Sequence, residues 1–257
     1  MEEVNNSITH FNHAIYYHNI YYKNYYFIIA LAYLPVIFKI KYIMEKFPPF
    51  KNKLSNLLLG MWNIFLSSGS LIGTYYVLPF LLSDLYNNGI IESTCKGYYR
   101  YNNYVSLVIT LFNISKFLEF IDTLFIVFRK SNLDFLHYYH HIITCLYCWN
   151  SSYFQISTGI YFAGINLIVH SIMYFYYALL AFDIKILVPY KKYITILQTT
   201  QMGLGTTVII VWINNCRHEY NIYHLLNHIM GLLMYISYGY LFSLLLFSNK
   251  KKVIKNI

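Results

Sequence analysis

Charged residues are scarce in this sequence. Asp, Glu, Lys and Arg together make up 11% of the 257 residues, whereas hydrophobic residues make up 58%. A soluble domain of this size carries roughly twice that charged fraction. Long uncharged apolar runs recur along the chain, and such runs are typical of membrane-spanning helices. The composition therefore excludes an ordinary soluble globular protein and predicts an all-α integral membrane protein.

The sequence also lacks signs of a second domain. It contains no stretch that suggests a soluble domain, a long linker or a solenoid repeat. The segment from Met1 to Lys23 carries Glu2 and Glu3 and has no apolar core, so it does not resemble a cleavable signal peptide. We expect residues 1–257 to form a single polytopic membrane domain.

Apolar stretches of about 20 residues predict seven membrane-spanning helices. They are expected near residues 25–43, 57–82, 104–128, 136–154, 158–182, 193–213 and 223–247. The first stretch is the least regular, because it contains Pro35 and ends among lysines.

The basic residues are distributed unevenly between the two predicted faces of the membrane. Most of the 19 lysines and arginines fall on alternate loops and on the C-terminal tail. These are Lys39, Lys41, Lys46, Lys51, Lys53, Arg129, Lys130, Lys185, Lys191, Lys192, Lys250, Lys251, Lys252 and Lys255. Basic residues concentrate on the cytosolic side because they resist translocation. The C-terminus is therefore expected in the cytosol and the N-terminus in the lumen. The net charge of +9 is explained by topology, since no compact basic patch suggests nucleic acid binding.

The four cysteines divide into two pairs. Cys95 and Cys216 fall on separate lumenal loops, where oxidation is permitted, whereas Cys145 and Cys148 lie inside the fourth predicted helix. We predict a Cys95–Cys216 disulfide; two free loop cysteines are the alternative.

Ionisable residues interrupt two of the predicted helices. Lys116, Glu119 and Asp122 share one broad face of the third helix, and His137, His140 and His141 share one side of the fourth. Such groups are costly inside a membrane and mark function by default. A simple i, i+3 ion pair is the alternative for Lys116 and Glu119, but it does not account for the third charge.

Polar stripes also occur on the next two helices. Asn166, His170, Tyr174 and Tyr177 lie close to one stripe of the fifth helix, and Gln198 and Gln201 share a face of the sixth with Thr195. Aromatic packing and interhelical hydrogen bonding are the structural alternatives. With the expected orientation, all four stripes lie at one depth near the cytosol. We therefore predict that they line one cavity that opens to the cytosol.

Four motifs in register carry a resemblance to a known family. They are KFLEFIDT (Lys116 to Thr123), the histidine box HYYHH (His137 to His141), NLIVHSIMYFYY (Asn166 to Tyr177) and TILQTTQ (Thr195 to Gln201). Their order and spacing resemble the ELO family of very-long-chain fatty acid elongases over roughly residues 105–205. The strings around the histidine box look most like the branch that handles saturated and monounsaturated chains.

The resemblance implies an endoplasmic reticulum enzyme with seven helices, six of them around a tunnel for the acyl chain. The implied reaction is a decarboxylative condensation of acyl-CoA with malonyl-CoA to 3-oxoacyl-CoA, CoA and carbon dioxide, with no cofactor or metal. Separate reductase and dehydratase proteins would take over the product. A homo-oligomer stays an open alternative.

The resemblance also suggests roles for individual residues. His140 would be the nucleophile, His137 and His141 would orient it or move protons, and His170 would contact the reacting carbonyl or the malonyl group. Asn166, Tyr174 and Gln198 could stabilise oxyanion charge, and Asp122 could fix a histidine tautomer. Glu119, Tyr177 and Gln201 would complete the substrate site. The candidates for binding the CoA phosphates are Lys116, Arg129, Lys130, Lys191 and Lys192.

Two other classes of protein share part of this pattern. A di-iron desaturase or hydroxylase also uses HxxHH boxes, but it would need roughly eight convergent histidines. The only other tight pair, His224 and His228, is predicted at the lumenal end, as are His10, His13 and His18. A seven-helix receptor would share the orientation, but it would not need three charges and four histidines in one slab.

Overall fold

The computed structural model describes residues 23–96 and 103–254, together with Thr9. Helices connected by turns and short loops make up this part of the chain, and no strand occurs in it. The helices are α2 (Lys23–Met44), α3 (Lys53–Lys96), α4 (Asn103–Leu118), α5 (Phe120–Phe128), α6 (Phe135–Tyr153), α7 (Gly159–Ala181), α8 (Lys191–Asn215) and α9 (Ile222–Ile254), with short 3-10 helices η2 (Lys185–Tyr190) and η3 (Arg217–Glu219). The predicted all-α class is confirmed.

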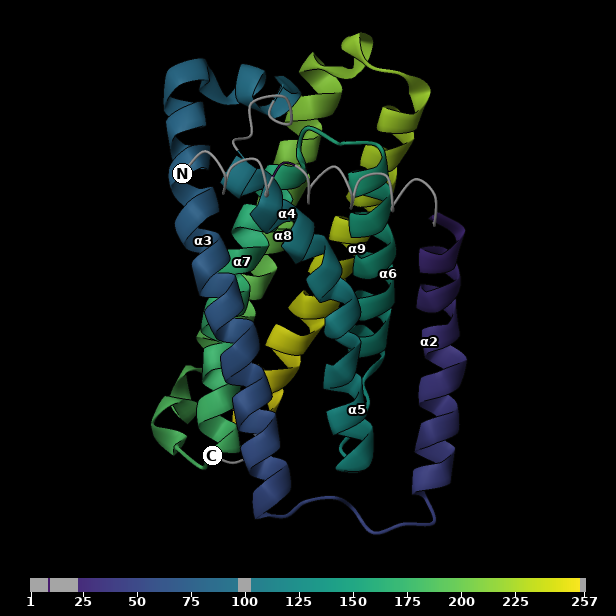
Figure 1. The fold of residues 1–257 in the computed structure, drawn as a ribbon. Coiled ribbons are helices and arrows are strands. Elements are labelled where there is room, and N and C mark those ends of the chain that lie inside the picture. Colours follow the sequence, from purple (N-terminus) through teal and green to yellow (C-terminus); the bar gives the residue numbers. More distant parts are fainter. Residues whose placement is uncertain (1–8, 10–22, 97–102, 255–257) are drawn as a thin grey trace.

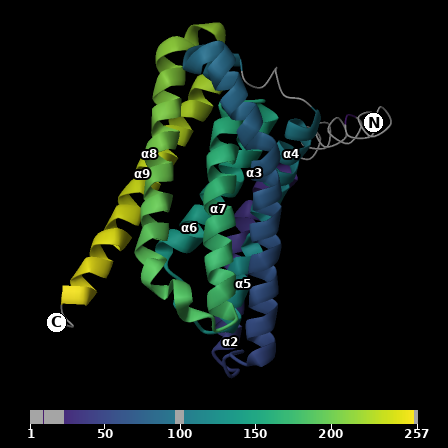
Figure 2. The ribbon, with the colours of Figure 1, turned by 90° about the vertical axis from the view of Figure 1, so that its left-hand side faces the viewer.

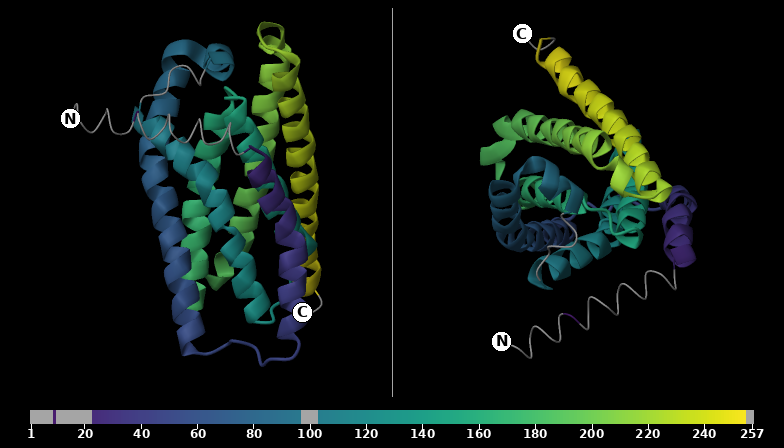
Figure 3. Two further views of the ribbon diagram at one scale, coloured as in Figure 1. Left: turned by 45° about the vertical axis from the view of Figure 1, so that its right-hand side comes forward. Right: turned by 90° about the horizontal axis from the view of Figure 1, so that it is seen from above.

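Six of the helices form a closed ring. Each helix contacts the next in the order α3, α7, α8, α9, α6 and α4, and α4 contacts α3, which closes the ring. Helix α2 packs against α5 and α6 at one edge of the bundle (Figure 1; Figure 3, right). The expected arrangement of six helices in a ring, with one beside it, is therefore present.

Within the described residues, six helical stretches are long and apolar enough to cross a membrane, and α6 is not among them. Helix α6 has 19 residues and carries the histidine box, Asn150, Ser151 and Ser152. It is surrounded by protein, because it contacts α2, α4, α5, α7 and α9. Its polar side chains therefore face other helices instead of lipid, which lowers the free-energy cost of placing them in a membrane.

Helix α3 differs from its expected range of 57–82, because it continues past Pro79 to Lys96 with a kink at Gly89. Gly89 has a φ of +72°, a conformation that side-chain-bearing residues rarely adopt. The kink is accompanied by a buried polar cluster. Asp84, only 8% exposed, accepts hydrogen bonds from Ser93 and from Asn88, the latter at 2.7 Å.

The expected single helix over 104–128 is interrupted at Glu119, where α4 ends and α5 begins. The Asp122 amide donates to the Glu119 carbonyl at 3.1 Å, which is the tighter i to i−3 pattern of a 3-10 turn. The interruption lies within the KFLEFIDT motif, so the backbone is irregular between the charged residues Lys116 and Asp122.

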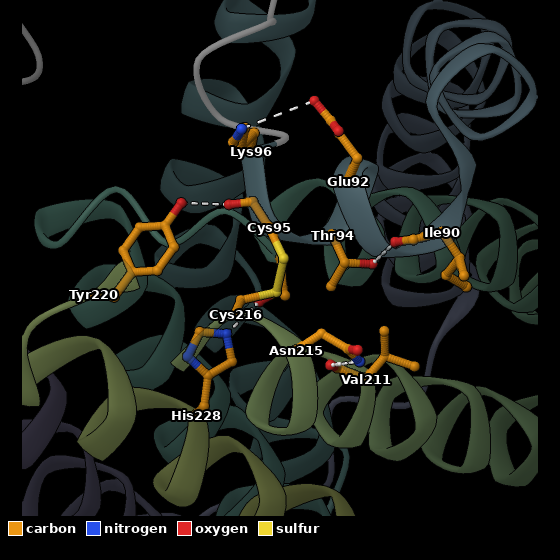
Figure 4. The surroundings of a disulfide bond; sticks show 11 residues. Ile90, Glu92, Thr94, Cys95, Lys96, Val211, Asn215, Cys216, Tyr220 and His228 are labelled. Atoms are coloured by element: carbon orange, nitrogen blue, oxygen red, sulfur yellow. Dashed lines mark hydrogen bonds and ion pairs between the residues drawn. A yellow bond between two sulfur atoms is a disulfide. The ribbon is translucent and has the colours of Figure 1, made fainter. Parts of the chain in front are cut away.

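The predicted Cys95–Cys216 disulfide is confirmed, with a Cα–Cα distance of 5.4 Å (Figure 4). It joins the end of α3 to the end of α8. The Tyr220 hydroxyl donates to the Cys95 carbonyl, and the buried Trp212 ring stacks on His228 at 3.6 Å. These contacts tie α3, α8 and α9 together at one end of the bundle, which we call the disulfide end.

The basic loops lie at the opposite end, which we call the basic end. The α2–α3 loop, the end of α5, η2 and the C-terminal part of α9 all lie there (Figures 1 and 2). The loops at this end carry Lys46, Lys51, Arg129, Lys130 and Lys185. Arg100 and Lys255 lie outside the described residues, as do His10, His13 and His18 and the side chains of Lys250, Lys251 and Lys252.

Candidate active site

The polar groups of the α4–α5 break meet those of α7 inside the bundle. Lys116 is 2% exposed, and its Nζ donates to Glu119 Oε1 at 2.6 Å and to Asn166 Oδ1 at 2.9 Å. The same ammonium lies 4.3 Å from the centre of the Phe112 ring. Lys116 is thus a buried, paired cation. Its placement differs from the expectation that it would bind CoA phosphates at the mouth of the site.

Glu119 links the lysine to a histidine. Its Oε1 atom lies 3.7 Å from His170 Nδ1, and both side chains are nearly inaccessible, at 4% and 8% exposure. The His170 ring also meets Tyr174 edge-on, with 5.2 Å between centres. A buried carboxylate beside a ring nitrogen favours the tautomer that carries a proton on that nitrogen. This geometry suits Glu119 to orient His170.

Asp122 has two other donors instead of the expected histidine. Trp62 Nε1 donates to Asp122 Oδ1 at 2.6 Å, and the Tyr174 hydroxyl donates to Asp122 Oδ2 at 2.7 Å. The carboxylate that approaches a histidine ring is Glu119, one turn earlier. Asp122 therefore ties α3, α5 and α7 together, because its two donors come from different helices.

The histidine box presents its rings as a packed group. His137 and His141 lie 4.3 Å apart between ring centres, and His140 meets His141 at 5.6 Å with perpendicular planes. His140 also contacts the Tyr238 ring at 5.0 Å. The Tyr238 hydroxyl donates to the His140 carbonyl at 3.1 Å and contacts Thr144 Oγ1 at 3.0 Å. Helix α9 thereby holds the turn that carries His140.

Histidines of α6 and α7 lie against the same segment, the α4–α5 break, and α6 and α7 contact each other. His170 of α7 approaches Glu119 at 3.7 Å, and His137 of α6, which packs beside His141, contacts Thr123 at 2.8 Å. His141 and His170 are buried, whereas His140 is partly accessible. The histidines of the two helices, together with Lys116, form the chemical centre of the candidate site.

Other predicted site residues occupy the surroundings of this centre. Asn166, Tyr174 and Gln201 are buried, and Gln198 Nε2 contacts Met173 Sδ at 3.1 Å, which connects α8 to α7. Tyr177, by contrast, is 42% exposed.

The remaining cationic candidates lie at the basic end. Arg129 Nη1 donates to Ser55 Oγ at 2.7 Å and to Asn56 Oδ1 at 2.8 Å, so part of its guanidinium is already engaged by α3. Lys130 is exposed and donates to the Glu45 carbonyl at 3.3 Å. Lys191 and Lys192 are exposed at the start of α8. The lysines are thus the more accessible partners for an anionic group.

Aromatic residues that contact the site and were not predicted include Trp62, Tyr238 and Tyr33 of α2, which bonds to Thr123. Each is an aromatic residue within an apolar run. In a chain with 30 Tyr, such residues give no contrast with their surroundings.

Within residues 23–96 and 103–254, no group of three or more His, Cys, Asp or Glu side chains is arranged to hold a metal ion. The pair His224 and His228 lies at the disulfide end. His228 there contacts Thr158 Oγ1 at 3.0 Å and the His224 carbonyl at 2.7 Å. The contacts of His228 are those of a packed structural residue.

Comparisons with known proteins identify the family of the chain. The chain matches the ELO: GNS1/SUR4 family over residues 19–253. It is 34% identical to fatty acid elongase 3 of Trypanosoma brucei brucei, across 87% of this chain and 80% of that protein. It is 32% identical to very long chain fatty acid elongase 6 of Gallus gallus, across 84% of this chain and 80% of that protein. No solved structure matches the chain. This chain therefore belongs to the ELO (GNS1/SUR4) family, together with the fatty acid elongases that it matches.

Proposed function

We propose that this membrane protein elongates long-chain fatty acids by condensing acyl-CoA with malonyl-CoA. The observation that carries the proposal is the placement of the histidine box and of His170 on two contacting helices of the ring, with His170 3.7 Å from Glu119, the buried partner of Lys116. Membership of the family supports fatty acid elongation, and the buried imidazoles support an acyl-transfer mechanism. The enzyme class that follows is a 3-oxoacyl-CoA synthase, an acyltransferase.

The first step is transfer of the acyl group to His140. A neutral ring nitrogen attacks the thioester carbonyl, a C–N bond forms, and the C–S bond breaks. The CoA thiolate leaves and takes up the proton released from the imidazole. His141 and His137, which pack in a row beside His140, orient the ring and carry this proton.

The second step is attack by the malonyl group. Malonyl-CoA loses carbon dioxide, and the resulting carbanion forms a C–C bond with the acyl carbonyl. The C–N bond to His140 then breaks, the departing ring nitrogen takes up one proton from water, and 3-oxoacyl-CoA and the neutral imidazole result. His170 is suited to contact the malonyl thioester oxygen, because Glu119 lies beside its Nδ1 and leaves Nε2 for the substrate. Asn166, Tyr174 and Gln198 are candidate donors to developing oxyanion charge.

The topology follows from the distribution of charge. We place the basic end in the cytosol, the disulfide end in the lumen of the endoplasmic reticulum, and the acyl chain within the helix ring. The CoA phosphates would then meet Lys191, Lys192 and Lys130, with Arg129 behind them. The reaction requires no cofactor, and reductase and dehydratase partners would process the product. The proposed substrates are saturated and monounsaturated chains, because the strings around the histidine box resemble those of the branch that handles them.

The test is incorporation of radiolabelled malonyl-CoA carbon into a supplied long-chain acyl-CoA by membranes that contain the protein. We expect His140→Ala to abolish incorporation. His218→Ala is the matched control, because His218 is exposed at the disulfide end and should tolerate the change. Full incorporation by His140→Ala would refute its assignment as the nucleophile. Absence of malonyl incorporation by the wild-type protein, across acyl chain lengths, would refute the reaction.

A further inference from the structure

Helix α2 packs beside the ring, yet one of its side chains is connected to the histidine box by hydrogen bonds through Thr123. Tyr33 is 6% exposed, and its hydroxyl lies 2.5 Å from Thr123 Oγ1 on α5. Thr123 itself is completely buried. A hydrogen bond between two buried hydroxyls contributes to stability and also restricts both groups to one geometry.

The Thr123 hydroxyl has a second contact, with His137. Thr123 Oγ1 and His137 Nε2 are 2.8 Å apart. A hydroxyl donates one hydrogen bond and can accept two. Thr123 therefore either donates to the His137 ring nitrogen and accepts from Tyr33, or accepts from the ring N–H and shares its other contact with Tyr33. In each arrangement Tyr33 occupies the other bonding position of Thr123, and the bond to Thr123 favours one tautomer and tilt of the His137 ring.

The position of Tyr33 is itself determined by packing. Its ring stacks on Phe120 with 4.2 Å between centres and 21° between planes. Tyr33 also belongs to a buried cluster with Ile37, Val127 and Ile142, which joins α2 to α5 and α6. The hydroxyl is therefore held in place by rigid neighbours on both sides of the hydrogen bond.

His137 transmits this position to the rest of the box. Its ring lies 4.3 Å from that of His141, which in turn meets His140. We propose that Tyr33 is a positioning residue for the condensation reaction: it holds the His137 imidazole in its working orientation through the Thr123 hydroxyl. This role rests on the proposed function, and it gives α2 a part in the chemistry besides that of an additional membrane anchor.

The first experiment removes single hydroxyls with little change in shape. Tyr33→Phe keeps the ring that stacks on Phe120, and Thr123→Val keeps the size of the side chain. We expect Tyr33→Phe to lower kcat for malonyl incorporation about 3- to 10-fold, the range for loss of one hydrogen bond, with KM for acyl-CoA unchanged. Thr123→Ser, which retains the hydroxyl, should restore most of the activity that Thr123→Val loses. Tyr42→Phe is the matched control on the same helix, because Tyr42 is 64% exposed.

A double variant tests the route of the effect. If Tyr33 acts through Thr123, then Tyr33→Phe should change kcat less than twofold in a protein that already carries Thr123→Val. If the fold-losses in kcat of the two single variants multiply in the double variant, the residues act independently and the proposal is overturned. An unchanged kcat in Tyr33→Phe would also overturn it. The same holds if Tyr33→Phe raises KM, or lowers the yield of folded protein, without lowering kcat. An active wild-type enzyme with an unaffected Tyr33→Phe variant refutes only this role, whereas an inactive wild-type protein refutes the condensation reaction itself.

Discussion

The buried Lys116–Glu119 pair allows the sharpest prediction. Lys116 Nζ lies 2.6 Å from Glu119 Oε1, and both residues are at most 3% exposed. Replacing Lys116 by Met leaves Glu119 as an unpaired buried carboxylate and removes the donor to Asn166. Breaking a buried ion pair on one side costs about 3–5 kcal/mol, because the remaining charge is not compensated. For chains of this size, that loss corresponds to a fall in Tm of roughly 6–20 °C.

The double variant Lys116→Met with Glu119→Gln separates stability from chemistry. It removes both charges, and replacing a whole buried pair by neutral groups is often close to neutral for stability. We expect its Tm to lie nearer to the wild-type value than that of Lys116→Met. Its condensation activity should nevertheless stay at least about tenfold low, because His170 has lost the carboxylate beside Nδ1.

The assay is thermal unfolding of the purified protein in detergent, followed by size-exclusion chromatography, in parallel with malonyl incorporation. Lys185→Met is the control, because Lys185 is an exposed lysine that pairs with Asp183 at 2.9 Å, and exposed pairs contribute little. A Lys116→Met protein as stable as the wild type would refute the reasoning about the buried charge. Full activity in the double variant would refute the role of Glu119 in orienting His170.

Two further predictions concern the ends of the site. Replacing Cys95 by Ser should lower Tm, because the disulfide closes a loop with a sequence separation of 121 residues. The chain-entropy model assigns about 4–5 kcal/mol of stabilisation to a loop of this length. Activity below the new Tm should persist, and an unchanged Tm relative to a Cys145→Ser control would contradict the prediction. Replacing Trp62 by Phe removes one donor to Asp122 and should cost about 1.5–3 kcal/mol in unfolding experiments; a value near zero would show that the Tyr174 donor alone satisfies this carboxylate.

Much of the fold was predictable because a membrane imposes a simple composition on its helices. Apolar runs of the required length predicted the helices, and the lysines and arginines predicted which loops share an end. The predicted helix bounds were wrong where the backbone departs from a regular helix and polar side chains or a turn accommodate the departure. The buried bonds of Asp84 accompany the kink at Gly89, and the turn at Glu119 divides α4 from α5. Hydropathy does not register such features.

The site was predictable to the extent that its residues contrast with their surroundings. Lys116, Glu119 and the four histidines are ionisable groups within apolar helices, and so they stood out. Tyr33, Trp62 and Tyr238 were missed because an aromatic residue in a membrane helix is ordinary. Nor could the spacing of Glu119 and Asp122 on one helix face show which of the two carboxylates faces His170 and which faces Trp62.

The sequence by itself determined the class of protein, the approximate positions of its helices and the set of ionisable residues that lipid would otherwise exclude. Only the tertiary structure decided which of these side chains bond to each other, and it added Tyr33 from outside the ring. The physical reason is that hydrophobic burial acts on whole helix faces, whereas a hydrogen bond depends on distances of a few tenths of an ångström between different helices. Those distances follow from how the helices pack.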